Sequence, residues 1–221
     1  MDGRVGGALT HPRRAAVPLR LLVAVSAGVL TGGLAAWAYH DDVLRPLSHV
    51  FLLWTATIAL LSARQPWRRA VVVSSVTLLA AVLAFYVGKQ VVYGIEYPGM
   101  PYALDTGQVL QWLVLAVVAG AVLGVAFAGI GTPGRAGSIG TAAALGLLVA
   151  DAYRRASSYP AEAPVVVTAA VLAAAAVLAV ALRSPRQLPG IAAWTVPAVL
   201  AGLVLVSAPD LLEQLLLTGR P

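Results

Sequence analysis

The sequence contains no cysteine and no asparagine, and only 11% of its 221 residues are charged. The absence of cysteine excludes disulfides, thiolate nucleophiles and cysteine-ligated zinc. Soluble domains carry about 25% charged residues, so this composition does not indicate a soluble domain. Catalytic motifs are missing too, because the chain has no HExxH, no GxSxG and no DDxxD. The sequence therefore gives no support for an enzyme, and we expect no metal site and no cofactor.

The chain is instead built from long apolar runs. Hydrophobic residues make up 60% of it, and the mean hydropathy is +0.86. A transmembrane helix needs about 20 mostly apolar residues, and short segments rich in proline, glycine and charge separate the runs. The sequence therefore predicts an all-α, polytopic transmembrane helical bundle of about seven spans, or six if the last segment is re-entrant. The predicted spans are 19–39, 47–63, 70–90, 109–130, 137–153, 165–182 and 191–207.

The charges indicate how the bundle is oriented. If the N-terminus is cytoplasmic, ten of the fifteen basic residues and only one of the nine acidic residues lie on the cytoplasmic side. This asymmetry follows the positive-inside rule. It also accounts for the net charge of +6, so no nucleic-acid partner is expected. The bias toward Ala, Val, Leu and Arg is typical of a high-GC bacterial genome. We therefore predict a multi-pass protein in the lipid bilayer of a bacterial cytoplasmic (inner) membrane.

Three regions are expected along the chain. Residues 1–18 form a basic cytoplasmic tail, residues 19–207 the transmembrane bundle, and residues 208–221 a short interfacial segment. The first apolar stretch, residues 21–39, is longer than the roughly 7–15 apolar residues of a signal peptide. We therefore interpret it as a retained first span.

Small residues recur every four positions in two predicted spans. The first stripe consists of Ala24, Gly28, Gly32 and Ala36, and the second of Ala116, Gly120, Gly124 and Ala128. This spacing places each stripe on one helix face, where another backbone can approach closely. The stripes serve either packing within the bundle or docking of another membrane subunit. The first stripe loosely resembles the substrate-binding subunits of energy-coupling-factor vitamin transporters, whose ATPase and coupling subunits are separate chains.

The stretch GLLVADAYRR, residues 146–155, places an acid at the end of an apolar run. Arg154 and Arg155 follow Asp151 by three and four residues, so all three share one helix face. One interpretation is an ion-paired cluster at the outer end of a short helix, where charged side chains reach water. The other is a small-molecule binding cluster at the mouth of an outward-facing cavity.

The longest outer loop, residues 89–108, supplies further candidates. If the third span continues as a helix, Lys89 and Tyr97 align with Glu96 nearby. They belong either to an interfacial aromatic belt or to a lid over the cavity. Trp54 lies nearer to mid-span, either in the core or in the wall of an apolar pocket. The predicted binding residues are Asp151, Arg154, Arg155, Glu96, Lys89, Tyr97 and Trp54.

Three stretches resemble an uncharacterised family of small actinobacterial multi-spanning membrane proteins. They are LRPLSHVFLLWTATIALLSARQPWRRA, AFYVG and GLLVADAYRR. The resemblance implies a membrane location and a helical bundle, and it brings no known activity. We expect a membrane protein that binds or transports a small molecule. The alternative is an accessory subunit that docks a membrane partner through the small-residue stripes.

Overall fold

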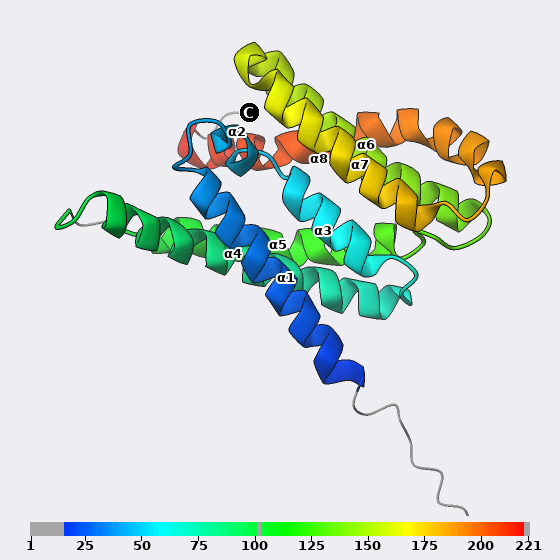
Figure 1. The fold of residues 1–221 in the computed structure, drawn as a ribbon, viewed down its shortest axis with the longest axis horizontal. Coiled ribbons are helices and arrows are strands. Elements are labelled where there is room, and N and C mark those ends of the chain that lie inside the picture. The colour runs from blue at the N-terminus through cyan, green and yellow to red at the C-terminus, as the bar shows by residue number, and fades with distance from the viewer. Residues whose placement is uncertain (1–15, 101–102, 219–221) are drawn as a thin grey trace, which may run out of the picture.

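The computed structural model describes the backbone of residues 16–100 and 103–218, and the side chains of residues 19–100 and 103–208. Within these residues every regular element is a helix, which confirms the predicted all-α bundle (Figure 1). The helices are α1 (Ala16–Ala38), α2 (Arg45–Ser48), α3 (Leu52–Ser62), α4 (Trp67–Glu96), α5 (Thr106–Phe127), α6 (Arg135–Ser158), η1 (Pro160–Glu162), α7 (Ala163–Ala181), η2 (Pro185–Gln187) and α8 (Leu188–Thr218).

Six of the described helices, α1 and α4 to α8, are long and apolar enough to cross a membrane. The chain is therefore a multi-pass membrane protein whose helices contact the lipid bilayer. The second predicted span, 47–63, is not a long helix. It is divided between α2 and α3, and α3 has only 11 residues. At 1.5 Å per residue α3 extends about 16 Å, roughly half the thickness of a bilayer's hydrocarbon core.

Helices α1 and α4 run in the same direction. Near their starts, Arg20 Nη1 donates a hydrogen bond to Gln65 Oε1 at 3.1 Å. Near their ends, His40 Nδ1 lies 2.8 Å from Glu96 Oε2. The chain between them must therefore return from one end of the bundle to the other, and α3 is the middle of that return. A seventh membrane crossing through α3, with a cytoplasmic N-terminus, stays a prediction.

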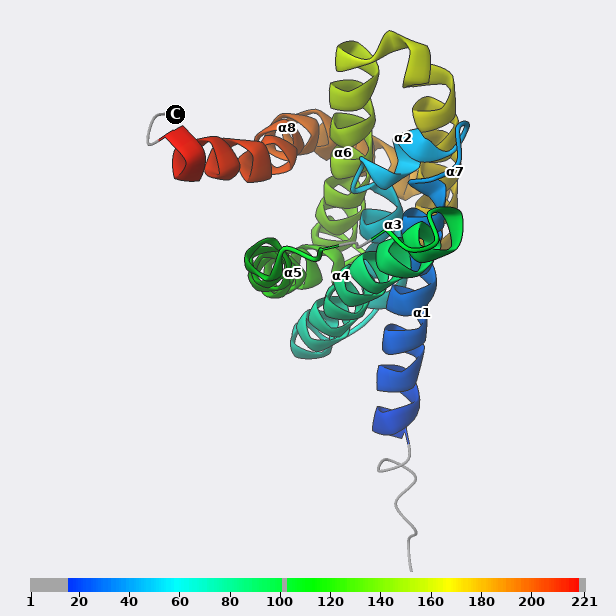
Figure 2. The same cartoon turned by 90° about the vertical axis from the view of Figure 1, so that its left-hand side faces the viewer.

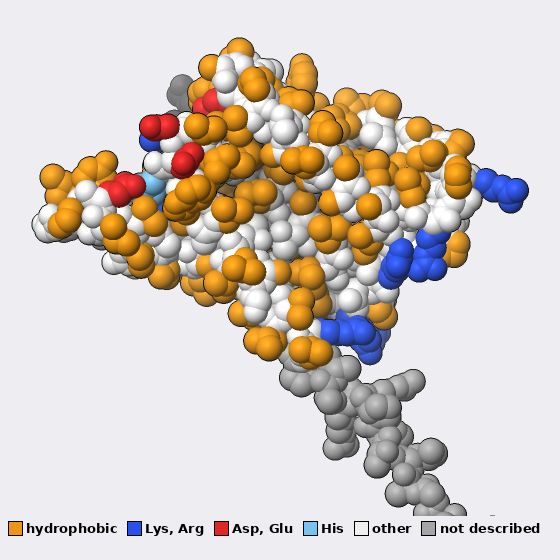
Figure 3. Space-filling model, in the orientation of Figure 1, with side chains coloured by type: hydrophobic (Ala, Val, Ile, Leu, Met, Phe, Trp, Pro, Cys, Tyr) orange, Lys and Arg blue, Asp and Glu red, His pale blue; other side chains and the backbone are white. Residues whose placement is uncertain are grey.

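Charged side chains gather at two opposite ends of the bundle (Figure 3). The basic end holds the described arginines next to the starts of α1, α4, α6 and η2, which are Arg20, Arg64, Arg68, Arg69, Arg135, Arg183 and Arg186. The acidic end holds Asp41, Asp42, Glu96, Asp105 and Glu162. Residues 1–15 of the predicted basic tail lie outside the described residues. The separation of charge follows the pattern on which the predicted orientation depends.

Helix α3 lies in the centre of the bundle and contacts α1, α4, α5, α6 and α7. Its Leu52, Ile58 and Ser62 are almost completely buried. Arg64 ends the helix in a left-handed backbone conformation, with φ of +60°. Its backbone N–H donates to the carbonyl of Ile130 at 2.9 Å, and its Nη2 donates to the carbonyl of Val180 at 2.6 Å. One residue thus supplies a backbone donor and a side-chain donor near the C-terminal ends of α5 and α7, where carbonyls lack helical partners.

Both small-residue stripes face α4. A Cβ added to Gly32 would lie 2.1 Å from the carbonyl oxygen of Ala81, and one added to Gly124 would lie 2.6 Å from the Cα of Val71. Helix α4 is therefore held between α1 and α5 at backbone contact distance. Gly28 and Gly120 also face α4, while Ala24, Ala36 and Ala116 are buried and Ala128 is half-buried. Because α4 covers the stripes, they are not available to dock another subunit.

Three helices are longer than the apolar runs that predicted them. Helix α4 extends to Glu96, α6 extends from Arg135 to Ser158, and α8 continues without a break to Thr218, past the predicted boundary at 207. An apolar run ends where polar residues begin, whereas a helix ends where its backbone hydrogen bonds end. Arginine and alanine are good helix formers, so α6 continues through Arg154 and Arg155. The expectation that this helix is short, with Asp151 at its end, was wrong.

Candidate functional site

Asp151 lies inside the bundle, about two turns before the end of α6, and its exposed fraction is only 1%. Among the described residues, neither carboxylate oxygen has a partner at hydrogen-bond geometry. The backbone N–H groups of Phe51 and Leu52 and the guanidinium groups of Arg154 and Arg155 lie close enough to act on the carboxylate electrostatically. Phe51 and Leu52 form the start of α3. The carboxylate therefore faces the N-terminus of the short central helix.

The predicted cluster of Asp151, Arg154 and Arg155 is not a closed ion triad. Arg155 pairs with Glu162 through two hydrogen bonds, Nε to Oε2 at 2.5 Å and Nη2 to Oε1 at 2.9 Å. Its guanidinium also lies 3.9 Å from the ring centroid of Tyr159. These contacts hold the α6–α7 connection together, because a bidentate arginine–carboxylate pair fixes both distance and orientation.

The other predicted binding residues at the acidic end join α1 to α4. Glu96 is bound by His40, and the ammonium of Lys89 lies 4.0 Å from the ring centroid of Tyr39, within the range of a cation–π contact. Tyr97 packs on Tyr93 with ring centroids 4.9 Å apart. These side chains are engaged in contacts at the acidic end of the bundle, as the interpretation of an interfacial cluster predicts.

His49, between α2 and α3, lies at the same end of the bundle. Partial burial lowers its pKa, and the positive charge of Arg155 lowers it further. The imidazole is therefore neutral at neutral pH and acts as an aromatic ring, 5.6 Å from the ring centroid of Tyr39. Among the described residues there is no group of three His, Asp or Glu side chains that could hold a metal ion.

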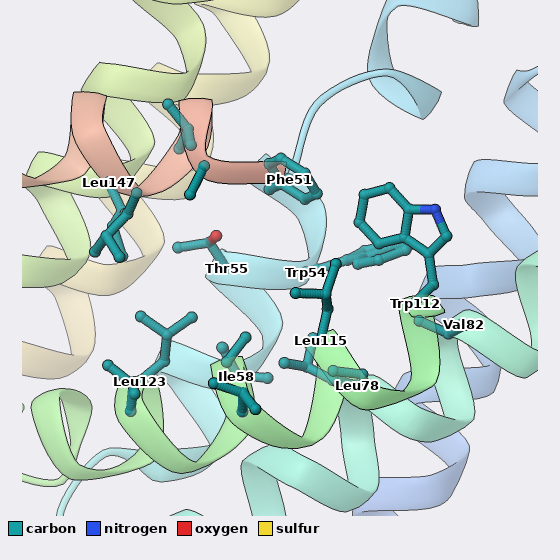
Figure 4. Close-up of a pocket in the computed structure, with 17 residues that line it drawn as sticks. Phe51, Trp54, Thr55, Ile58, Leu78, Val82, Trp112, Leu115, Leu123 and Leu147 are labelled. Atoms are coloured by element: carbon teal, nitrogen blue, oxygen red, sulfur yellow. The ribbon is translucent and has the colours of Figure 1, made fainter. Parts of the chain in front are cut away.

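A cavity of about 330 Å³ lies between α3, α4, α5, α6 and α8 (Figure 4). We call it the lateral groove. Its wall is mostly apolar, and the polar side-chain groups of its lining residues are the hydroxyl of Thr55 and the indole N–H groups of Trp54 and Trp112. The ring of Phe51 contacts both Trp54 and Trp112, with centroids 6.4 and 6.0 Å apart. Aliphatic side chains complete the wall, among them Ile58, Leu78, Val82, Leu115, Leu123, Leu147, Leu205 and Val206.

The lateral groove opens between α5 and α8, on the side of the bundle that these two membrane-spanning helices form. These two helices do not pack against each other, and Figure 2 shows them as separate arms on one side of the bundle. Val118, Val122 and Leu205 line the groove while 48–56% of each side chain is exposed. The lining residues of α4, α5, α6 and α8 lie well inside these helices rather than at their polar ends. The groove is therefore accessible from the hydrocarbon region.

The lateral groove is not the outward-facing cavity with charged lining residues that the sequence predicts, and that cavity stays a prediction. Of the seven predicted binding residues only Trp54 lines the groove. Asp151, Arg154, Arg155, Glu96, Lys89 and Tyr97 lie outside its wall. Sequence reasoning missed Phe51 and Trp112, because searching for charged residues at helix ends does not find an apolar site. The signal that could have found them is the repeated occurrence of aromatic residues within apolar runs, beginning with Trp54.

One of the comparisons with known proteins identifies a family for this chain. Residues 11–212 match a family of unknown function, DUF6518. The chain belongs to the DUF6518 family. This match confirms the predicted resemblance to an uncharacterised family, while the actinobacterial origin stays a prediction. A comparison of this DUF6518 protein with curated proteins finds no match, and neither does a comparison with solved structures. The candidate site of this DUF6518 protein is therefore argued from its own geometry.

Proposed function

We propose that this protein binds a small apolar molecule, the hydrocarbon chain of a lipid or of a lipid-like compound, in the lateral groove. The observation that carries the proposal is an aromatic-lined cavity that opens into the hydrocarbon region. Its volume of about 330 Å³ lies at the lower end of the roughly 300–1,000 Å³ of ligand sites. This size suits one chain or one small ring system better than a whole phospholipid.

The source of affinity in such a groove differs from that of a water-facing pocket. Lipid tails are as apolar as leucine, so burial from lipid into protein brings little hydrophobic gain. Affinity must come from close packing, and rigid aromatic rings provide a large contact area at fixed positions. We therefore expect the groove to prefer a chain whose shape fits Phe51, Trp54 and Trp112. Transport of such a molecule is an extension of this proposal.

A bacterial inner membrane and a cytoplasmic N-terminus are part of the proposal. The concentration of described arginines at one end supports this orientation. The lateral groove then lies between the two leaflets' polar surfaces, with Trp112 in the half of α5 nearer the acidic, outer end.

Quenching of Trp54 fluorescence by brominated fatty acids tests the proposal. The test protein keeps Trp54 and has phenylalanine in place of each of the other four tryptophans. It is reconstituted into lipid nanodiscs. Because bromine quenches only at contact, we expect saturable quenching of Trp54. Ala119 lines the groove, so Ala119→Phe should abolish saturation by filling it.

Two controls make the quenching experiment decisive. Val114→Phe adds the same ring to an exposed position of α5 outside the groove, and it should leave the saturation of Trp54 unchanged. A protein that keeps only Trp37, whose side chain is 49% exposed, should show quenching proportional to the brominated fraction of the lipid. Trp54 quenching that is linear and insensitive to Ala119→Phe would refute the proposed site.

A further inference from the structure

The first backbone N–H groups of α3 lie inside the bundle and receive no side-chain cap from the helix's own N-cap residue. The first N–H groups of an α-helix have no partner within the helix, and inside a membrane protein there is little water to replace one. Helix α3 begins at Leu52, which is 1% exposed, and Val50 just before it is 6% exposed. Phe51, at the N-cap position, provides no side-chain oxygen. An acceptor from another helix is therefore needed here.

Asp151 on α6 is placed to supply that acceptor. The residue is only 1% exposed, and the backbone N–H groups of Phe51 and Leu52 lie close enough to its carboxylate to act on it electrostatically. A carboxylate at a helix N-terminus is stabilised by the free N–H groups and by the helix dipole. No described donor, those of α3 included, engages either oxygen at full hydrogen-bond geometry, so both oxygens are buried acceptors that remain open to the free N–H groups of α3.

We propose that Asp151 is a positioning residue of the lateral groove, whose carboxylate caps the N-terminus of α3 from the neighbouring helix α6. Helix α3 and its cap carry four groove-lining side chains, Phe51, Trp54, Thr55 and Ile58. The cap fixes the end of the helix on which the aromatic wall begins. Asp151 therefore shapes the groove without touching its occupant.

Two parts of this inference can be separated. The effect of Asp151 on binding rests on the function proposed above, whereas the contact between Asp151 and α3 does not. Amide hydrogen exchange of residues 51–55 measures that contact without any ligand, because exchange reports local opening of the helix. Saturable quenching of Trp54 measures binding. A failure of the proposed function would leave the exchange result unchanged.

Amide exchange should distinguish capping from a general loss of stability. In Asp151→Leu we expect residues 51–55 to exchange at least about tenfold faster than in the natural protein. Asp151→Asn keeps one acceptor oxygen and nearly the same volume, so a smaller acceleration is expected. Thr141→Val is the matched control, because Thr141 is buried on the same helix and bonds only to the carbonyl of Gly137. It should leave exchange in α3 unchanged.

A second variant tests the cap even if Asp151→Leu does not fold. Phe51→Asp places a carboxylate at the N-cap of α3 itself, a preferred residue for that position. Added to Asp151→Asn, it should restore slow exchange of residues 52–55, while Trp54 quenching stays weak because the Phe51 ring is lost. Unchanged exchange in Asp151→Asn and Asp151→Leu would overturn the proposal. Failure of Phe51→Asp to slow exchange in the Asp151→Asn background would also overturn it.

Discussion

At the scale of single residues, the bundle is shaped by side chains that are small and by side chains that reach across helices. Gly32 and Gly124 let α1 and α5 touch the backbone of α4. Arg64 and Asp151 supply, from outside, the donors and acceptors that helix ends lack. Arg64, and in our proposal Asp151, thus compensate helix ends, whereas apolar side chains form most of the cavity wall.

The glycine contact gives a prediction with a built-in control. A methyl group at Gly32 would lie 2.1 Å from the carbonyl of Ala81, whereas one at Gly33 would meet no atom within 4 Å. Gly32→Ala should destabilise the protein by about 1–3 kcal/mol, as overpacking does. Gly33→Ala should be neutral or should stabilise it by up to about 1 kcal/mol, because alanine favours helix. Thermal unfolding in detergent measures both, and equal effects of the two changes would contradict the packing described.

At the scale of elements, α3 is the unusual feature. A central helix of 11 residues returns the chain between the parallel helices α1 and α4. Discontinuous helices at the membrane midplane often accompany binding sites in membrane proteins, because irregular backbone there must line a cavity or be buried in protein. In this chain the start of α3 lies beside both Asp151 and the lateral groove.

The return of the chain through α3 can be tested with single cysteines, since the natural sequence has none. Asp42 and Arg68 are exposed and lie on either side of the α2–α3 segment. We expect Asp42→Cys to react with a membrane-impermeant maleimide added to intact cells. Arg68→Cys should react only after the membrane is opened. Labelling of both from the same side would show that α3 does not cross.

The elements were predictable from the sequence to different degrees. The six long helices follow from apolar runs of sufficient length, as at 165–182 for α7. The break before α3 has no such signal, because Ser48 to Phe51 contain neither proline nor glycine. In our proposal the start of α3 is capped by Asp151, which lies a hundred residues further along the chain. The prediction of Trp54 as a pocket residue was possible from its mid-span position, but Phe51 and Trp112 join it only through the packing of α3 against α5.

At the scale of the whole molecule, the helices form two closely packed groups with the lateral groove between them. Helix α4 packs closely between α1 and α5, and α6 packs closely on α8. These two units leave α5 and α8 apart, and the lateral groove lies between them (Figure 2). Contiguous apolar hollows of this kind mark ligand or partner sites more often than empty surface. The lateral groove is therefore our proposed functional site of this DUF6518 protein.

Native mass spectrometry of the protein extracted gently from its own membranes tests this central claim most directly. The account predicts one apolar molecule bound per chain, retained in Val114→Phe and lost in Ala119→Phe, because only the latter fills the groove. Identical mixtures of weakly held lipid in all three proteins would contradict it. So would a co-purifying membrane chain that is displaced by Ala119→Phe, since the groove would then be the docking site of an accessory subunit.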